Sequence, residues 1–454
     1  MIILNKKEID NGTWFENVKE ELTNKNISEI HIDASHAKYS LKIYDAIKSA
    51  ISAVGTYDKS DRTVIYTGCD TVEMAITFSE YLKTLGIESK LILDLRQGTK
   101  NCSLLMKLLK TSEDQKALAN SMMETAKWLV SGKKKGTYIK ILSPRYYNPS
   151  PDEHKLLLKY DNIYNETAIF YGNKVNSRDL LSRSIFSFPT IREAQKLGID
   201  FEFFKKVYYE AMSIHPDMII DKIRGLKFYE HLLSSSIEGK SLRITDEFGT
   251  NLTLSLNKRP LLAETGRAGN MSLDNTLPFE IWTTNHYSGE LCTAPVETSA
   301  NGVIISKIPL ITPYGTINNY KIAFKDGKAV KKTKFIDSKG RERIAITKAE
   351  SGNDVLMELI GLSNNNYTGD QQKAFQARGI IAELGVCPVN PVIEKHLTGL
   401  ESTTGNVLLD EKLRLHIATG TNEFMGGKTP ISFNNSRVWH TDFLLGERYD
   451  IQPI

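Results

Sequence analysis

Hydrophobic positions in the first part of the chain alternate between the period of a strand and that of a helix. Short apolar runs at 29–33, 63–67 and 90–95 predict three strands. Between the last two runs, positions 72, 75, 76, 79, 82 and 85 recur at helical spacing, and Gly86 is expected to end that helix. This order predicts a βαβ unit, and runs at 138–142 and 167–171 predict two further strands.

The rest of the chain changes from helical to strand periodicity. Helices are predicted over 191–197, 201–212 and about 218–233. Beyond them, 242–245 and 252–256 predict one hairpin, and 319–324 predicts a second with the run that begins at Lys328. The sequence therefore predicts an α/β domain with a small, largely parallel sheet over residues 1–185. An α+β or mainly β domain is expected over residues 186–454.

Composition narrows the class of protein. A chain of 454 residues with 25% charged and 41% hydrophobic residues is an ordinary globular protein of two domains. A net charge of +4 gives no electrostatic footprint for nucleic acid, and no run reaches the ~18–20 apolar residues of a membrane span. Four cysteines without a CxxC pair, and a start without the pattern of a secretory signal, predict reduced thiols and a cytoplasmic location.

Residues that can ligate a metal gather in the last third of the chain. His440 and Asp442 stand two apart in a run that is typical of a strand, so they are expected to share one face. His416 lies in another short apolar run and is the natural second nitrogen ligand. Glu290 and Glu383 lie beside glycines, in segments expected to be turns. Mixed nitrogen and oxygen ligands suit a divalent cation, so the carboxy-terminal domain is predicted to be metal-binding.

Each of these residues also has a structural interpretation. A single histidine in an apolar strand is more often a hydrogen-bonded core residue than a ligand. Only the occurrence of all these acidic residues and histidines together favours a metal site. Glu411 is either a proton carrier beside the metal or an ion-paired residue at a helix start. Arg267 either binds a substrate carboxylate or lies at the surface. His286 and His396 are expected to be exposed in polar loops.

Several segments taken in order resemble the aminopeptidase T / aminopeptidase S family of metallopeptidases. The resemblance runs from about residue 189 to 445 and implies a homodimer that binds two divalent metals, zinc, cobalt or manganese, and acts on peptides. It also implies metal ligation by Glu290, His416, His440 and Asp442. The segments that carry it are Gly289-Glu290-Leu291-Cys292, Ile381-Ala382-Glu383-Leu384-Gly385, Leu409-Asp410-Glu411-Lys412, His416-Ile417-Ala418-Thr419-Gly420, Gly426-Gly427 and His440-Thr441-Asp442.

The chain departs from the family's pattern at two places. Peptidases of the family have Leu-Gly-Glu where this chain has Leu384-Gly385-Val386, so the second carboxylate is either Glu383 or missing. They also have a tyrosine a few residues after the strand histidine. This chain has none there, and Glu423 could supply an oxygen in its place.

A second branch of the superfamily is similar over the same domain. The 2,5-dihydroxypyridine dioxygenases use one Fe(II), for which His416, His440 and Asp442 would be a suitable set. The first hypothesis is therefore a metal-dependent aminopeptidase that uses a metal-activated water, with Glu411 or Glu383 as proton carrier. The alternatives are a mononuclear non-heme Fe(II) ring-cleaving enzyme and a ligand-depleted binding protein. A peptide or small-molecule substrate is expected, and neither nucleic acid nor a membrane.

Overall fold

Two compact units make up the chain. The first comprises residues 1–213, 282–287 and 404–408, and the second comprises residues 214–281, 288–403 and 409–454. The computed structural model describes residues 3–4, 60–68, 71–94, 111–132, 135–142, 163–167, 169–170, 181–266, 269–270, 272–273, 280–281, 283–286, 288–337, 339–399 and 403–454.

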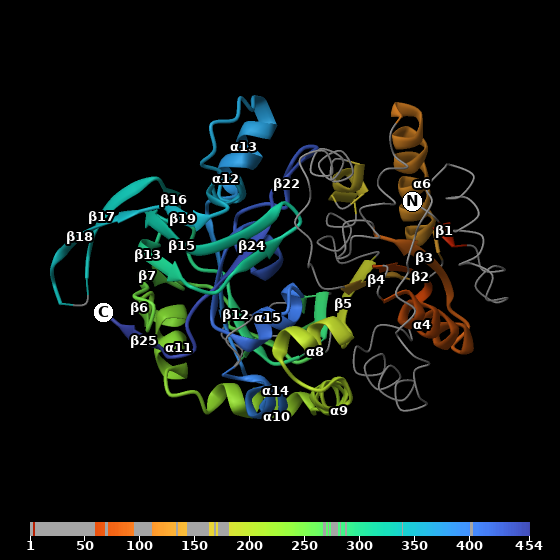
Figure 1. Ribbon diagram of the computed structural model, residues 1–454, viewed down its shortest axis with the longest axis horizontal. Helices are drawn as coiled ribbons and strands as arrows, with labels where there is room; N and C mark the ends of the chain where they lie inside the picture. Colours follow the sequence, from red (N-terminus) through yellow and green to blue (C-terminus); the bar gives the residue numbers. More distant parts are fainter. Residues whose placement is uncertain are drawn as a thin grey trace. The chain divides into compact units, whose positions relative to one another are not determined.

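The first unit contains a six-stranded sheet in the order β1-β3-β2-β4-β5-β11 (Figure 1). Strands β2 to β5 and β11 run parallel to their neighbours, and only β1 is antiparallel. The predicted α/β part with a largely parallel sheet is confirmed. Its elements are β1 (Ile3–Leu4), β2 (Ser60–Thr67), α4 (Val72–Thr84), β3 (Glu88–Leu93), α6 (Ser112–Val130), β4 (Lys135–Leu142), β5 (Leu181–Ser187) and β11 (Thr283–His286).

One predicted strand of this unit is wrong. Residues 163–167 and 169–170 are helical, not extended. Tyr164, Thr167 and Ile169 are the buried positions there, and the separation of three residues between Tyr164 and Thr167 is that of one helix face. A short apolar run does not by itself distinguish a strand from a buried helix. The sheet instead uses β5, which the sequence analysis missed, and the strand predicted at 29–33 lies outside the described residues.

The first two helices after β5 have the predicted bounds. Helix α8 (Ile191–Leu197) begins at a capping box between Thr190 and Glu193, and α9 (Phe201–Met212) begins at the Asp200 cap. The helix predicted over 218–233 is instead two helices, α10 (Pro216–Arg224) and α11 (Tyr229–Glu238). The break is at Gly225, a residue with poor helix propensity. Within the described part of the chain, no helix is long and apolar enough to cross a membrane.

The second unit contains two antiparallel sheets, as the mainly β prediction requires. One has eight strands in the order β14-β15-β13-β7-β6-β25, with β16 and β19 also paired to β15. The other has the order β24-β21-β20-β12-β8. Both predicted hairpins, β6 with β7 and β15 with β16, are confirmed.

The strands of the first sheet are β6 (Ser241–Asp246), β7 (Asn251–Ser255), β13 (Asn301–Ser306), β14 (Leu310–Thr312), β15 (Gly315–Lys325), β16 (Lys328–Val330), β19 (Lys348–Ser351) and β25 (Tyr449–Pro453). Those of the second are β8 (Leu262–Glu264), β12 (Glu290–Thr293), β20 (Ile381–Val386), β21 (His416–Gly420) and β24 (His440–Leu444). Smaller strand pairs are β9 (Gly269–Asn270) with β10 (Glu280–Ile281), β17 (Lys332–Ile336) with β18 (Glu342–Ile346), and β22 (Ser432–Phe433) with β23 (Ser436–Arg437). The remaining helices are α12 (Asn353–Leu359), α13 (Gly369–Ala377), α14 (Pro391–Leu397), α15 (Val407–Leu413) and the short η4 (Glu423–Met425).

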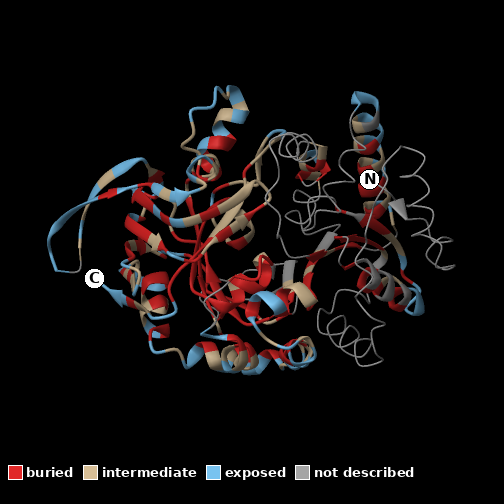
Figure 2. Cartoon of the chain, in the orientation of Figure 1, coloured by how far each residue is buried: buried red, intermediate tan, exposed pale blue. Residues whose placement is uncertain are grey.

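One hydrophobic core joins the two sheets of this unit. Leu252, Ile304 and Ile322 of the eight-stranded sheet belong to the same buried cluster as Leu384 and Ile417 of the five-stranded sheet. Strands β12, β20 and β21 are buried along their whole length (Figure 2). Since side chains alternate along a strand, the other face of the five-stranded sheet carries a second set of buried residues.

A buried amide links the start of α15 to the capping box of α8 in the first unit. Asn406 is fully buried. Its Nδ2 donates hydrogen bonds to Ser187 Oγ and to Glu193 Oε1, and the distance from Nδ2 to Glu193 Oε1 is 2.8 Å. We expect Asn406→Ala to lower the free energy of unfolding by about 1–3 kcal/mol, because the buried Glu193 carboxylate loses a donor. Urea denaturation measures this. Asn257→Ala, at an exposed position, is the control, and equal midpoints for the two variants would contradict the assignment.

Candidate metal centre

The face of the five-stranded sheet opposite the core carries the predicted ligands. Glu290 lies on β12, Glu383 on β20 and His416 on β21, while His440 and Asp442 lie two apart on β24. Their neighbours Leu291, Leu384, Ile417 and Phe443 point into the core. The prediction that Glu290 and Glu383 stand in turns is wrong, because both lie within strands. Strand alternation thus brings five of the predicted residues to one surface.

A glycine on the central strand lets the side chains of its two neighbours meet. Gly385 of β20 pairs with Cys292 of β12 on one side and with His416 of β21 on the other. A Cβ atom at this position would lie 2.1 Å from His416 Nε2 and 2.5 Å from Glu290 Oε1. Without it, the His416 ring and the Glu290 carboxylate approach to 3.1 Å above the backbone. Any larger residue would fill that space.

Glu383 lies between the two histidines. Its Oε2 is 2.8 Å from His440 Nε2, and its Oε1 is 4.0 Å from His416 Nε2. His440 Nε2 is also 3.2 Å from Asp442 Oδ1. A register shift in the pairing of β20 with β21, between Ile381 and Glu383, precedes this residue, as β-bulges often do beside functional sites.

Backbone carbonyls fix which nitrogen of each ring faces the cluster. The Nδ1 atom of His416 is 3.2 Å from the Arg414 carbonyl, and that of His440 is 2.7 Å from the Thr421 carbonyl. Each Nδ1–H therefore donates to the backbone, and each Nε2 presents its lone pair to the carboxylates. The lone pair of each Nε2 and the lone pairs of the facing carboxylate oxygens repel one another. A proton or a metal cation must therefore lie between nitrogen and oxygen.

A buried lysine, which the sequence analysis missed, compensates part of the negative charge. Lys412 of α15 is fully buried, and its ammonium group contacts the carboxylates of Glu264 and Glu290. Lys412 contacts Oε2 of Glu290, while Oε1 of the same carboxylate faces His416 Nε2, 3.1 Å away. The available signal was the apolar context of α15, with leucines at 408, 409, 413 and 415, which indicates a buried helix.

Burial and mutual charge shift the pKa values of the cluster. Burial alone would lower the pKa of His416, but the negative charges of Glu290, Glu383 and Asp442 outweigh it and raise the pKa to about 9. Burial raises the pKa of Glu264 to about 8, although Lys412 opposes the shift. For Glu290 the balance is reversed, because Lys412 and His416 outweigh burial and hold its pKa below the usual range.

Glu411 belongs to the same cluster. Burial and the negative charge of Asp442 raise the pKa of Glu411 well above its ordinary value, and the two carboxyl groups share a hydrogen bond. Glu411 therefore carries the proton and donates it to Asp442. This environment differs from that of a solvated, ion-paired helix start, which was the structural interpretation of this residue.

The other candidates lie elsewhere. Arg267 is outside the described residues. Glu423 Oε1 accepts a hydrogen bond from the Ile431 N–H, 3.1 Å away, and so holds its own loop. The expectation of an exposed His286 is wrong: the ring is 4% exposed, stacks on Phe186, and burial lowers its pKa to about 3. His396 lies on helix α14 and not in a loop.

The arrangement fits a divalent cation. Five carboxyl groups, those of Glu264, Glu290, Glu383, Glu411 and Asp442, face one ammonium group and two imidazoles. In the metal-free protein, protons on groups with raised pKa values such as His416 and Glu264 compensate the buried negative charge, and a cation can take their place. Donor atoms lie within 4.8 Å of one another in three groups: Glu290 with Cys387 and His416, Glu290 with Cys292 and Glu383, and Glu383 with His440 and Asp442.

Comparisons with known proteins agree at the level of the fold. No protein-family model and no curated protein matches the sequence. Among solved structures, wild-type AmpT from Thermus thermophilus is similar, with a TM-score of 0.57 and 16% identity over 91% of this chain and 95% of that chain. The 2,5-dihydroxypyridine dioxygenase from Pseudomonas putida KT2440 gives 0.41 and 14% over 90% and 93%. The first likeness confirms the fold anticipated by the resemblance to aminopeptidase T.

The role of Gly385 can be tested by adding one carbon. We expect Gly385→Ala to weaken Zn(II) binding by about 100-fold or more, because the methyl group displaces the His416 ring and the Glu290 carboxylate. Isothermal titration calorimetry measures the affinity, and circular dichroism checks the fold. Gly225→Ala, where a Cβ would meet its nearest atom at 3.4 Å, is the control. Unchanged affinity in Gly385→Ala would refute the assignment of this glycine.

Stability of the metal-free protein should fall as the pH rises. His416 and Glu264 have folded-state pKa values of about 9 and about 8, above the ordinary 6.5 and 4.5. Both groups contribute stability fully below their ordinary pKa values, and this contribution is lost as pH rises through about 8 to 9. For His416 the difference corresponds to roughly 3 kcal/mol.

Thermal unfolding between pH 6.5 and 9.5, in the presence of a chelator, measures this dependence. We expect the melting temperature to fall across that window, and less steeply in His416→Gln. Zn(II) should stabilise the protein more at pH 8.5 than at pH 6, because the cation replaces the proton on His416. A melting temperature that rises with pH over this window would show that the cluster does not hold these protons.

Proposed function

We propose that this chain is a metal-dependent aminopeptidase that removes amino-terminal residues from peptides. The observation that carries the proposal is the position of Glu383, whose two carboxylate oxygens face different histidines. One carboxylate between two imidazoles suits two divalent cations side by side. The fold likeness to AmpT from Thermus thermophilus supports the same function.

The proposal assigns the ligands to two subsites. Glu290 and His416 would hold the first cation, His440 and Asp442 would hold the second, and Glu383, which lies between the two histidines, would serve both. A mononuclear Fe(II) site would need both histidines and Asp442 around one ion. The two imidazoles instead fall in different groups of neighbouring donor atoms among the described residues, which favours two ions.

Cations held in this way would polarise the scissile carbonyl and lower the pKa of a bound water, so that hydroxide is available near neutral pH. Glu411 is suited to proton transfer because its carboxyl group shares the proton of a hydrogen bond with Asp442, and burial raises its pKa well above the ordinary value. It would donate this proton to the leaving amine. Glu383, the other proton-carrier candidate, would be engaged by both cations in this assignment, which leaves Glu411 as the proton donor.

Charge and exposure support a substrate with a free amino group. The cluster is rich in carboxyl groups, so a positively charged peptide end is attracted to it. The side chains of His440 and Asp442 are 21% and 11% exposed, whereas His416 is 1% exposed. The substrate therefore reaches the second subsite first. Arg267 and Glu423 stay candidate substrate-binding residues. The proposal includes a homodimer on the resemblance alone and a cytoplasmic location on the scattered cysteines.

The bridging position of Glu383 predicts a joint loss of metal and activity. Wild-type protein should bind about two Zn(II), Co(II) or Mn(II) ions per chain and release leucine from leucyl-p-nitroanilide. In Glu383→Gln, we expect about one ion or fewer and a fall in kcat of about 1,000-fold or more, which corresponds to roughly 4 kcal/mol of transition-state stabilisation.

Metal analysis and the chromogenic assay measure both effects. Glu230→Gln, on the exposed face of α11, is the matched control and should keep metal and activity. One iron per chain with oxygen uptake and no peptide cleavage would replace the proposal by the mononuclear oxygenase. Absence of any bound metal would leave only a binding protein.

A further inference from the structure

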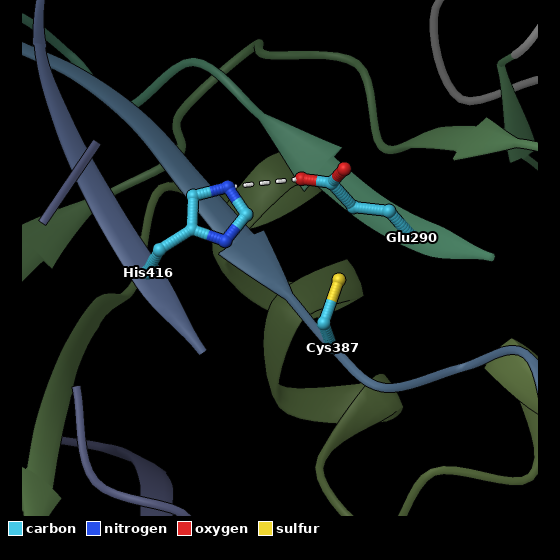
Figure 3. Close-up of side chains that lie close together, drawn as sticks. All are labelled: Glu290, Cys387 and His416. Atoms are coloured by element: carbon cyan, nitrogen blue, oxygen red, sulfur yellow. Dashed lines mark ion pairs between the residues drawn. The ribbon is translucent and has the colours of Figure 1, made fainter. Parts of the chain in front are cut away.

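A buried thiol lies beside the first subsite. Cys387 immediately follows β20, at the alternate position after Glu383 and Gly385, and so continues the polar face of that strand. Its Sγ, an oxygen of Glu290 and a ring nitrogen of His416 all lie within 4.8 Å of one another. Figure 3 shows the three side chains pointing toward a common centre. All three are buried.

We propose that Cys387 is a ligand of the first subsite, which thereby presents carboxylate, imidazole and thiolate to one cation. The proposal rests on the metal-binding function proposed above and specifies which metal this subsite selects. When the cation binds, the S–H bond breaks, the sulfur–metal bond forms and the proton leaves to solvent. No electron is transferred.

The neighbours of the thiol leave its sulfur available. Its hydrogen bond to the Gly289 carbonyl, at 3.8 Å, is one that a thiol makes only weakly. Lys412 already occupies Oε2 of Glu290, and the buried Oε1 is directed at the same centre, beside His416 Nε2. Zn–S bonds of about 2.3 Å and Zn–N bonds of about 2.0 Å separate donor atoms by roughly 3.3–3.6 Å in a tetrahedral site. The observed cluster needs only small side-chain shifts to reach such spacing.

The other thiol on this face has a different environment. Cys292 lies in an apolar cluster with Leu262, Ala294 and Met425. Its sulfur is grouped with two carboxylates and no imidazole. Cys292 is therefore a matched control: a second buried cysteine, on the adjacent strand of the same sheet.

The thiol gives the two subsites different preferences. Sulfur favours Zn(II) and Co(II) over Mn(II) and Mg(II), whereas the carboxylates of Glu383 and Asp442 with one imidazole accept harder cations as well. We expect the first equivalent of Zn(II) or Co(II) to enter the subsite of Cys387. Mn(II) should bind the second subsite and should show no preference for the subsite of Cys387.

Titration of the metal-free full-length protein with Co(II) tests the proposal. The expected result is a thiolate-to-cobalt charge-transfer band in the near ultraviolet at the first equivalent, in the wild type and in Cys292→Ser. Cys387→Ser should lack this band, keep the visible cobalt bands, and bind Zn(II) about 10- to 100-fold more weakly with unchanged Mn(II) affinity. A near-ultraviolet band that persists in Cys387→Ser, or is lost in Cys292→Ser, overturns the proposal.

X-ray absorption of the wild-type protein with one equivalent of Zn(II) gives a measurement that does not depend on the folding of any variant. One sulfur neighbour at about 2.3 Å is expected. Bound zinc with only nitrogen and oxygen neighbours would overturn the thiol ligand and leave the aminopeptidase proposal intact. No bound zinc or cobalt would overturn both.

Discussion

The approach of His416 to Glu290 above Gly385 is the contact on which the site depends. Strands β12 and β21 are separated by β20, so their backbones are about 10 Å apart. Side chains from these two strands meet directly above β20 because Gly385 has no Cβ. Directly behind this position, Leu384 packs into the core between the two sheets, so the platform under the site is rigid. The hydrophobic core therefore fixes the geometry of the polar face.

Charge compensation is the second constraint, and it assigns separate tasks to the oxygens of one carboxylate. Lys412 holds Oε2 of Glu290 and also contacts Glu264, so the ammonium group and the two carboxyl groups are buried as one hydrogen-bonded unit. Oε1 is thereby left with a fixed direction toward His416 and Cys387. A lysine with the same charge at the surface would not have this effect. The burial of Lys412 thus orients a ligand as well as neutralising it.

Sequence patterns and the family resemblance were sufficient for the two-part architecture and for five residues of the cluster, but not for the rest of the site. Two-residue spacing placed His440 and Asp442 on one face, because alternation is a local property of a strand. Glu264 and Lys412 were missed because their pairing joins residues 148 apart in sequence and no local pattern encodes it. Cys387 was classed only as a reduced thiol for the same reason. The misplaced strand at 167–171 and the missed β5 show that a short apolar run leaves the type of element undetermined.

His440 and Asp442 are more exposed than His416 and Glu290, and the order of the strands in the sheet explains this difference. β24 is at the edge of the five-stranded sheet, whereas His416 and Glu290 flank its central strand. Edge residues His440 and Asp442 keep some exposure, and the inner residues keep almost none. A cation on the inner residues would exchange slowly and act mainly to hold Glu383 and His416 in place. The edge position would retain the open coordination that a substrate requires, so in the proposed enzyme the inner cation would have a structural role and the outer cation a catalytic one.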